Sequence, residues 1–353
     1  MSGSSPIVLM EGFDHLSAAQ MSTKNWVETH SGGMNAFGVT TGLLGTGQCL
    51  RLGSGGNNGT ATFRKTTTFT GISSFSVGFR YRFNGTIIGL AALNSPEILQ
   101  LLTTVSSGRV ASIQLQSDGF FRILNAAGSI VATGTNLYVN NTVVHLELTG
   151  TVATSGVTLT LYVNGTQEAQ ATNVNTGSSN VVNIMFNASH VSASGAGTDD
   201  FDDVYVSSSA THLGDLKVEV LNLNAEGTNT AWPANTGTKV AAIDQTTSYD
   251  SDTDFISSST PGDRQTFTAS ALSIAAGPVY AVQTNIVARK DDAGTRQVAD
   301  TVRQGSTNYD GNASIGLSAS YIVYSQIHDQ DPTGTDWTVT TINGNEYGVS
   351  EVV

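Results

Sequence analysis

The chain of 353 residues is predicted to be an all-β protein built from two β-sandwiches in series. Three observations predict this fold class: apolar and polar residues alternate with period two, glycine-containing turns separate the alternating runs, and only 12% of the residues are charged. So low a charge disfavours disordered and coiled-coil proteins, which depend on charged residues. Because the length exceeds what one core usually holds, we expect two domains, residues 1–210 and residues 211–353.

The strands of the first domain are predicted to have one apolar and one polar face. In Phe75–Phe83 ("FSVGFRYRF"), the aromatic and aliphatic residues share one side, and Arg80 and Arg82 share the other. Residues 144–148 alternate in the same way, which places His145 and Glu147 on the solvent side. One wet face and one dry face are typical of an antiparallel sheet.

Turn residues support this interpretation. Asn164-Gly165 lies between two alternating runs and favours the positive φ angles of a type I′ hairpin. Residues 117–119 ("SDG") and 125–128 ("NAAG") predict two further hairpins. Helix is scarce, and the best candidate is the short run Asp14–Met21, with Asp14 as its N-cap.

The second domain is also predicted to consist of strands. Residues 279–288 alternate, and a further strand is expected around Tyr321. The charged run Arg289–Gln297 contains Gly294 and predicts a hairpin turn, and Asp331-Pro332 predicts a loop. We therefore expect a second β-sandwich after the first.

The net charge, the apolar runs and the first residues of the chain limit the kinds of function that we expect. The net charge is −13, from 28 acidic and 15 basic residues, which disfavours nucleic acid as a partner. No apolar run approaches the length of a membrane span, and the first residues lack the basic region of a signal peptide. With Cys49 as the single cysteine, no intrachain disulfide is expected, so we expect folding in a reducing cytoplasm.

Both halves contain ordered sets of short motifs. In residues 6–210, "EGFDHL", "LYVNGTQEA" and "DDFDDVYV" follow the order seen in concanavalin-A-like, laminin-G-like jelly rolls, in particular those of tailed-bacteriophage virion proteins, which this half resembles. The second half resembles phage virion proteins through Trp232-Pro233, Asp254–Ser259, Ala288–Gly294, Asp331–Thr338 and Ile342–Val349. The resemblance implies a structural place in the virion, with other virion proteins as partners and synthesis in the bacterial host cytoplasm. Symmetric homo-oligomers are expected, because viral assemblies reuse subunits.

Four neighbouring carboxylates are the strongest candidate for a site. Asp199, Asp200, Asp202 and Asp203 repel one another unless they are solvated, paired or bound to a cation. In a strand from Phe201, Asp202 is expected on the face of Val204 and Val206, and Asp203 on the face of Phe201 and Tyr205. One interpretation is a calcium site, since carboxylates supply the hard oxygen ligands that this ion prefers; the sequence suggests no other cofactor. The other is a strand entrance at the sandwich rim, where the carboxylates are solvated or accept backbone N–H groups.

Two further features bear on binding and catalysis. Arg80, Arg82 and Tyr162 are predicted to protrude, and ordinary solvated side chains are the first interpretation. The alternative is a binding face, in which the arginines dock an acidic partner or an anionic glycan and Tyr162 stacks on a sugar ring. No Glu-x-Asp-x-x-Glu strand occurs, and a catalytic dyad such as Glu147 with Asp202 is left as an alternative.

These observations predict a non-enzymatic structural protein of a bacteriophage virion. We expect it to be associated with the tail, baseplate or fibre, to be exposed at the surface, and to serve assembly and contact with host glycan. The alternatives are a decoration protein of the capsid or tail, and a protein that binds or cleaves carbohydrate.

Overall fold

The structure, a computed structural model, describes residues 6–31, 37–53, 59–85, 97–190, 197–311 and 314–353. They form two compact units. The N-terminal unit contains Ile7–Asp14 and Asn25–Val218; the C-terminal unit contains Pro6, His15–Lys24 and Glu219–Val353. Both consist of antiparallel strands, so the all-β prediction is confirmed. The division into folding domains at residue 210 stays a prediction.

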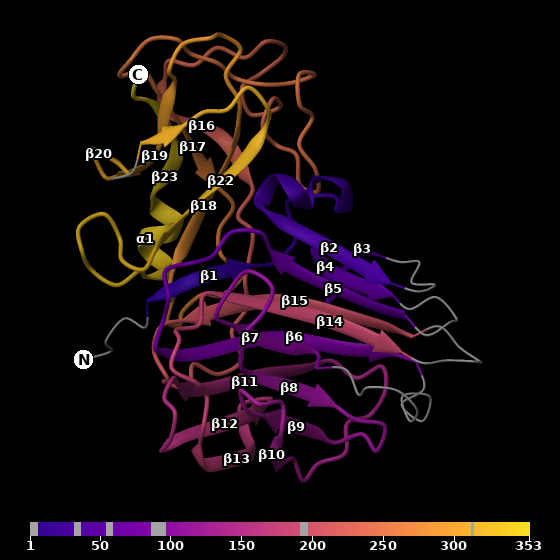
Figure 1. Cartoon of the computed structure of the whole chain (residues 1–353). Helices are drawn as coiled ribbons and strands as arrows, with labels where there is room; N and C mark the ends of the chain where they lie inside the picture. The colour runs from indigo at the N-terminus through magenta and orange to yellow at the C-terminus, as the bar shows by residue number, and fades with distance from the viewer. Residues whose placement is uncertain (1–5, 32–36, 54–58, 86–96, 191–196, 312–313) are drawn as a thin grey trace. The chain divides into compact units, whose positions relative to one another are not determined.

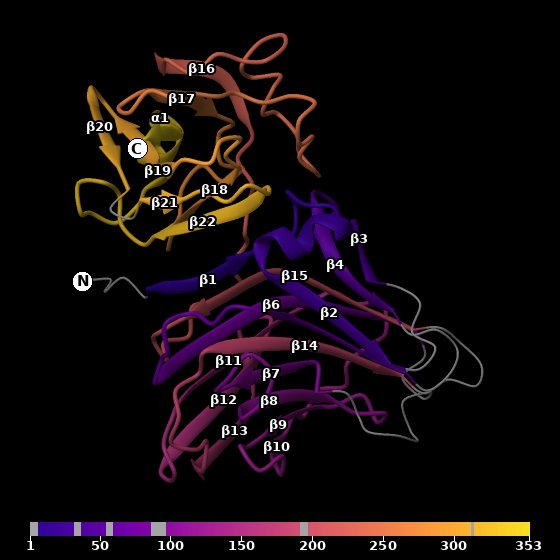
Figure 2. The same cartoon turned by 45° about the horizontal axis from the view of Figure 1, so that its top comes forward.

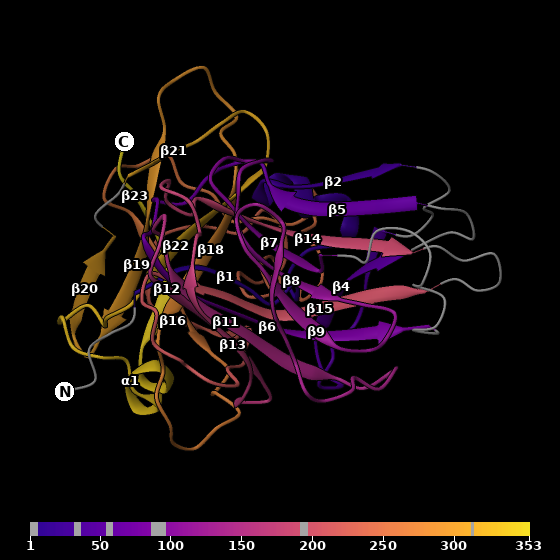
Figure 3. The same cartoon turned by 60° about the horizontal axis from the view of Figure 1, so that its bottom comes forward.

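The N-terminal unit is a sandwich of two antiparallel sheets (Figures 1 and 3). Within the described ranges, the first sheet has the strand order β13-β12-β11-β6-β15-β4-β3, with β1 also paired to β15. The second has the order β10-β9-β8-β7-β14-β5-β2. The strands of the first sheet are β1 (Ile7–Glu11), β3 (Phe37–Thr41), β4 (Gln48–Gly53), β6 (Ser74–Asn84), β11 (Val144–Thr151), β12 (Val157–Val163), β13 (Thr166–Val174) and β15 (Thr198–Ser207). Those of the second sheet are β2 (Trp26–Ser31), β5 (Gly59–Lys65), β7 (Leu99–Leu102), β8 (Arg109–Leu115), β9 (Phe121–Leu124), β10 (Ile130–Thr133) and β14 (Asn183–His190).

The core of this sandwich contains the apolar face of β6, as predicted. The five residues of that face are at most 2% exposed: Phe75, Val77, Phe79, Tyr81 and Phe83. Phe79 meets Phe186 of the opposite sheet edge to face, with 5.4 Å between ring centroids. Full burial of each such side chain stabilises the fold by roughly 1.5–3 kcal/mol, so this strand is a main source of the unit's stability.

The predicted hairpin turns are confirmed. Asn164 (φ +50°) and Gly165 (φ +77°) join β12 to β13. Gly119 and Gly128, both with φ near +80°, lie in the turns that join β8 to β9 and β9 to β10. Each position requires the left-handed conformation that glycine and asparagine adopt most easily.

The prediction that the outer face of β6 and β11 is exposed to solvent is wrong. On this face, Ser76, His145 and Glu147 are fully buried and Arg80 is 9% exposed. The cover is residues 208–218, which follow β15: the backbone amides of Leu213 and Gly214 donate to Glu147. Periodicity predicts which residues share a face, but not whether a distant loop covers it.

The C-terminal unit is a smaller sandwich (Figure 2). Among its described residues, one sheet has the order β16-β17-β23-β19-β20, with β21 paired to β19, and β18 pairs with β22 in a second. Val298 and Val349 of the larger sheet, together with Trp232 after β16, pack against Ile286 and Tyr324 of the smaller one. The strands are β16 (Leu223–Thr230), β17 (Arg264–Ala269), β18 (Val282–Ala288), β19 (Gln297–Gln304), β20 (Thr307–Asp310), β21 (Ile315–Gly316), β22 (Ile322–His328) and β23 (Glu346–Glu351).

Two predictions of local structure are wrong. Arg289–Gln297 is not a hairpin turn, because β18 pairs with β22 while β19 pairs with β23, so this segment connects two sheets. Asp14 does not cap a helix; its carboxylate accepts from the amide of Gln48 at 2.5 Å, and a 3-10 helix, η1, spans Ala18–Lys24.

A short helix, α1 (Val339–Gly344), was not predicted. It starts with a capping box in which the side chains of Thr338 and Thr341 bond reciprocally to each other's backbone. No described helix is long and apolar enough to cross a bilayer.

Candidate functional site

The four neighbouring carboxylates of β15 have different surroundings, because successive side chains of a strand point to opposite faces of the sheet. β15 turns Asp199 into the sandwich, where its Oδ1 accepts from the Tyr81 hydroxyl at 2.6 Å. Burial, followed by the charge of Asp199, raises the pKa of Tyr81 well above its usual value. Asp200 is turned to the outer face, since it lies opposite Arg82 of β6 and Arg51 of β4.

Asp200 is fully buried and surrounded by donors. Arg51 donates to both of its oxygens, at 2.7 and 2.9 Å. Arg82 donates to Oδ2 at 2.7 and 3.1 Å, and the Asn84 amide donates to the same oxygen at 2.7 Å. Two guanidinium groups and an amide therefore compensate this charge, and the paired Arg51 has a raised pKa.

A β-bulge separates Asp202 from Asp203. Asp202 lies opposite Arg80, whereas Tyr205 lies opposite Gly78, so β15 has one more residue here than β6. Asp203 takes φ +50° in the bulge. The predicted sharing of faces is wrong for this reason: the register places Asp202 and Tyr205 on one face and Val206 on the other.

The bulge gives the two carboxylates different partners. Asp202 accepts from the amides of Leu43 and Asp203, and burial, followed by the charge of Asp203, raises its pKa to about 8. Asp203 accepts from Arg80 Nε at 2.6 Å and from the Val218 amide at 2.8 Å. Within the part of the chain that the structure describes, no group of three His, Cys, Asp or Glu side chains is arranged to hold a metal ion. Calcium at these positions stays a prediction.

The residues predicted to bind a partner lie on the same outer face. Arg80 bridges Asp203 and Asp215, at 2.6 Å from each, and is buried rather than protruding. Arg82 is partly exposed beside Asp200. Tyr162 stacks on the His212 ring, with 3.9 Å between centroids, and so already has an aromatic partner. Their role in binding stays a prediction.

Glu147 is engaged separately from Asp202. It accepts from Ser76 and from the amides of Leu213 and Gly214, and its Oε2 lies 2.6 Å from His212 Nδ1. These bonds fix residues 208–218 over the sheet. The carboxylates of β15 and β11 are thus held by separate sets of donors within the N-terminal unit.

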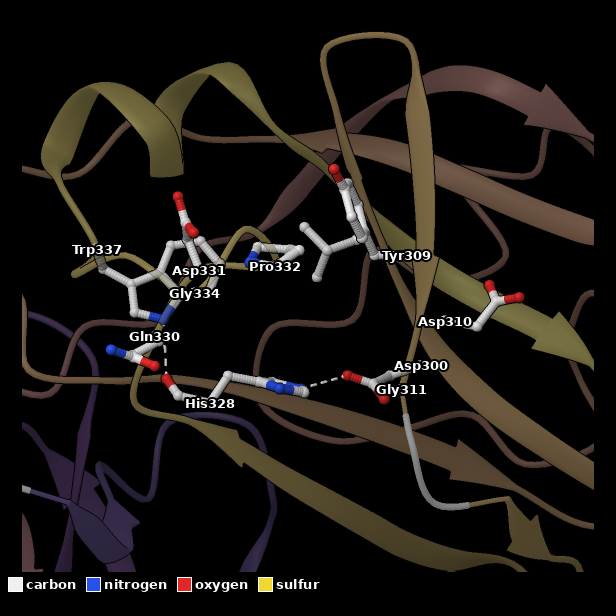
Figure 4. Close-up of a pocket in the computed structure, with 11 residues that line it drawn as sticks. Asp300, Tyr309, Asp310, Gly311, His328, Gln330, Asp331, Pro332, Gly334 and Trp337 are labelled. Atoms are coloured by element: carbon white, nitrogen blue, oxygen red, sulfur yellow. Dashed lines mark hydrogen bonds and ion pairs between the residues drawn. The ribbon is translucent and has the colours of Figure 1, made fainter.

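A pocket of about 290 Å³ lies in the C-terminal unit (Figure 4). β19 and β20 form one side of it, the end of β22 another, and the loop before α1 a third. Its lining combines carboxylates, an imidazole, an amide and two aromatic rings. The lining residues are Asp300, Val302, Tyr309, Asp310, Gly311, His328, Gln330, Asp331, Pro332, Gly334 and Trp337.

His328 and Asp300 point toward each other across this pocket (Figure 4). Nε2 of His328 lies 2.5 Å from Asp300 Oδ2, which also accepts from the Thr284 hydroxyl at 3.0 Å. The hydrogen bond with Asp300 raises the pKa of His328. The Trp337 indole donates to the His328 carbonyl at 2.9 Å and so fixes the end of β22 against the loop.

The other two carboxylates of the pocket are held ionised. Burial alone would raise the pKa of Asp331, but hydrogen bonds from Thr333, Thr335 and Gln304 outweigh it and lower the pKa to about 2. Asp310 is paired with Arg264, which lowers its pKa.

No residue of this pocket was predicted as a site residue. Its members come from segments up to 37 positions apart, Asp300 to Trp337, and no spacing motif joins them. The one local signal, Asp331-Pro332, correctly predicts a turn, in which the Gly334 amide donates to the Asp331 carbonyl at 2.9 Å. Asp300 lies on β19 and His328 on β22, which belong to different sheets, so only the packing of the two sheets brings them together.

Neither a family model nor a curated protein sequence matches the chain. Among solved structures, it is similar to the cellulose-induced protein Cip1 (14% identity, TM-score 0.40), covering 56% of this chain and all of that one. It is also similar to the lectin UEA-II complexed with galactose (13% identity, TM-score 0.40; 57% and 99% covered). A third is the binding domain of botulinum neurotoxin serotype C1 (13% identity, TM-score 0.38; 95% and 93% covered). TM-scores below 0.5 say nothing about the ligand or activity of this chain.

Proposed function

We propose that the protein is a non-enzymatic binding protein that holds a saccharide in the pocket beside Asp300 and His328. The lining of this pocket carries the proposal. Carboxylates accept hydrogen bonds from the hydroxyl groups of a sugar, the Gln330 amide both donates and accepts, and the ring of Tyr309 offers an apolar surface. A volume of about 290 Å³ is at the small end of ligand pockets and suits one or two sugar units.

The protonation state of the pocket's carboxylates supports a binding role rather than hydrolysis. A glycosidase needs a carboxylic acid with a raised pKa to protonate the leaving oxygen. In this pocket the pKa values of Asp310 and Asp331 are lowered instead.

A glycan array followed by calorimetric titration tests this proposal. Wild-type protein should retain neutral or basic glycans, and Tyr309→Ala should reduce that binding at least tenfold. Tyr280→Ala, which removes the same ring in the same unit away from the pocket, serves as the matched control and should bind normally. Binding that survives Tyr309→Ala unchanged, or release of reducing sugar from a bound glycan, would contradict the proposal.

A second candidate function concerns location. The ordered motifs from Trp232 to Val349 resemble phage virion proteins, and they support a structural protein of a bacteriophage particle. We propose a tail, baseplate or fibre position with the pocket available to host-surface glycan; decoration of the capsid or tail is the alternative. Antibody-labelled microscopy of purified virions would locate the protein, and its absence from them would contradict this candidate.

A further inference from the structure

The charges in the C-terminal pocket do not balance. Among the described residues that line it, none is Lys or Arg, and His328 is the one side chain that can carry positive charge. Arg264, from outside the lining, compensates Asp310. Asp300 and Asp331 are therefore left against a single imidazolium, which makes the pocket negative.

Asp300 is the less compensated of these two carboxylates. Its side chain is 2% exposed, and its two side-chain donors, Thr284 and His328, both bond to Oδ2. Oδ1 accepts no hydrogen bond in the described part of the chain. A buried carboxylate oxygen without a donor is costly, and a positive group in the pocket reduces that cost.

Gly311 makes room for this oxygen, which packs against its Cα atom. A Cβ atom at Gly311 would lie 2.0 Å from Oδ1 of Asp300, so any larger residue would displace the carboxylate. Gly311 itself lines the pocket. Asp300 lines it too, so the carboxylate lies in the pocket wall where only glycine fits beside it.

Asp331 adds a second fixed charge. Its oxygens accept from the amides and hydroxyl of Thr333 and Thr335 and from Gln304, so it stays ionised over the working pH range. An acidic ligand would have to approach both carboxylates in a confined space of low dielectric, where like charges repel strongly.

We propose that the pocket selects a saccharide bearing a free ammonium group and rejects saccharides bearing a carboxylate. This specificity rests on the proposed saccharide binding. The ammonium supplies N–H donors and positive charge to the Asp300 side of the pocket, while the hydroxyl groups meet Gln330 and Asp331.

Calorimetric or NMR titration of the full chain with three probes tests the inference at pH 7 and low salt: the methyl glycosides of glucosamine, glucose and glucuronic acid. We expect glucosamine to bind about tenfold tighter than glucose, and glucuronic acid to bind weaker than both, with the preference shrinking as salt is added. Methylammonium alone should bind at least tenfold weaker than the glucosamine glycoside.

Two variants test whether the preference for the ammonium group arises at Asp300 and Gly311. Asp300→Asn should bring glucosamine binding down to that of glucose. Gly311→Ala should weaken it as well, whereas Gly316→Ala, where an added Cβ would meet nothing within 4 Å, should leave it unchanged. A melting curve for each variant shows whether it is folded, and the three-probe comparison on wild-type protein needs no variant.

The outcomes separate the two proposals. If no sugar binds, saccharide binding at this pocket fails. If sugars bind but glucuronic acid matches or exceeds glucosamine, the ammonium preference is overturned while saccharide binding stands. If methylammonium binds as tightly as the glucosamine glycoside, the inference is also overturned, because the sugar would then contribute nothing.

Discussion

Removing the charge of Asp200 should destabilise the N-terminal unit. Asp200→Asn leaves Arg51 and Arg82 without their carboxylate and turns an amide donor toward two guanidinium groups. Breaking a fully buried ion pair costs about 3–5 kcal/mol. Because Arg51 and Arg82 are 33% and 27% exposed and regain some hydration, we expect the lower end, about 3 kcal/mol. For a unit of this size that is a fall in melting temperature of roughly 6–12 °C.

Differential scanning calorimetry with and without calcium is the assay. Asp118→Asn is the matched control, since Asp118 also pairs with an arginine in this unit but is 46% exposed, and we expect it to change the free energy of unfolding by about 0.5 kcal/mol or less. The reasoning would be refuted if Asp200→Asn melted within 2 °C of wild type. It would also be refuted if calcium stabilised the wild type and Asp200→Asn abolished that gain, because a cation would then occupy the place of the guanidiniums.

Three further predictions concern the same unit. The ring nitrogens of His145 have no partner among the described residues, and burial lowers its pKa to about 4. The unfolded chain then binds a proton that the folded chain does not, so the free energy of unfolding should fall by about 3 kcal/mol as the pH drops from 6.5 to 4. His145→Phe should remove this pH dependence when urea unfolding is measured at pH 7 and 4.5. An unchanged pH dependence in this variant would count against the role of His145. The raised pKa of Asp202 has the opposite effect on stability. Its carboxyl group keeps a proton up to about pH 8 in the folded chain, so stability should fall as the pH rises from 4 to 8. Asp202→Asn should flatten that loss in the same measurement. Phe79→Asp would bury an unpaired charge in the core and should prevent folding; a soluble product with wild-type melting would disprove the assignment of this strand.

Period-two alternation predicted the core because it is a local property of the chain. Phe75–Phe83 occupies the inner face as expected, and Asn164-Gly165 forms its turn, since both depend on neighbouring residues alone. The sandwich of the N-terminal unit was predictable to this extent.

Features that depend on distant segments were not predictable. The bulge at Asp203 exists where β15 pairs with β6, and it shifts every following residue to the opposite face. Glu147 and Arg80 have the polar character of surface residues, yet residues 208–218 cover them. The same holds for the pocket, in which Asp300 and His328 meet through the packing of two sheets and no sequence spacing marks them.

The helix α1 illustrates a weaker local signal. Its capping box uses Thr341 at the third position, where Glu or Gln is the usual residue, and its six residues are too few for a periodic pattern. The capping geometry explains the helix once the structure is known, but the residues alone did not distinguish it from a turn.

Saccharide binding by paired variants tests the account most directly. Binding of the glucosamine glycoside should be lost in Tyr309→Ala and retained in folded Asp200→Asn, because the pocket binds the ligand and the acidic residues of β15 hold the sandwich together. Binding that persists in Tyr309→Ala and disappears in folded Asp200→Asn would contradict both parts of the account, since it would place the ligand at the carboxylates of β15.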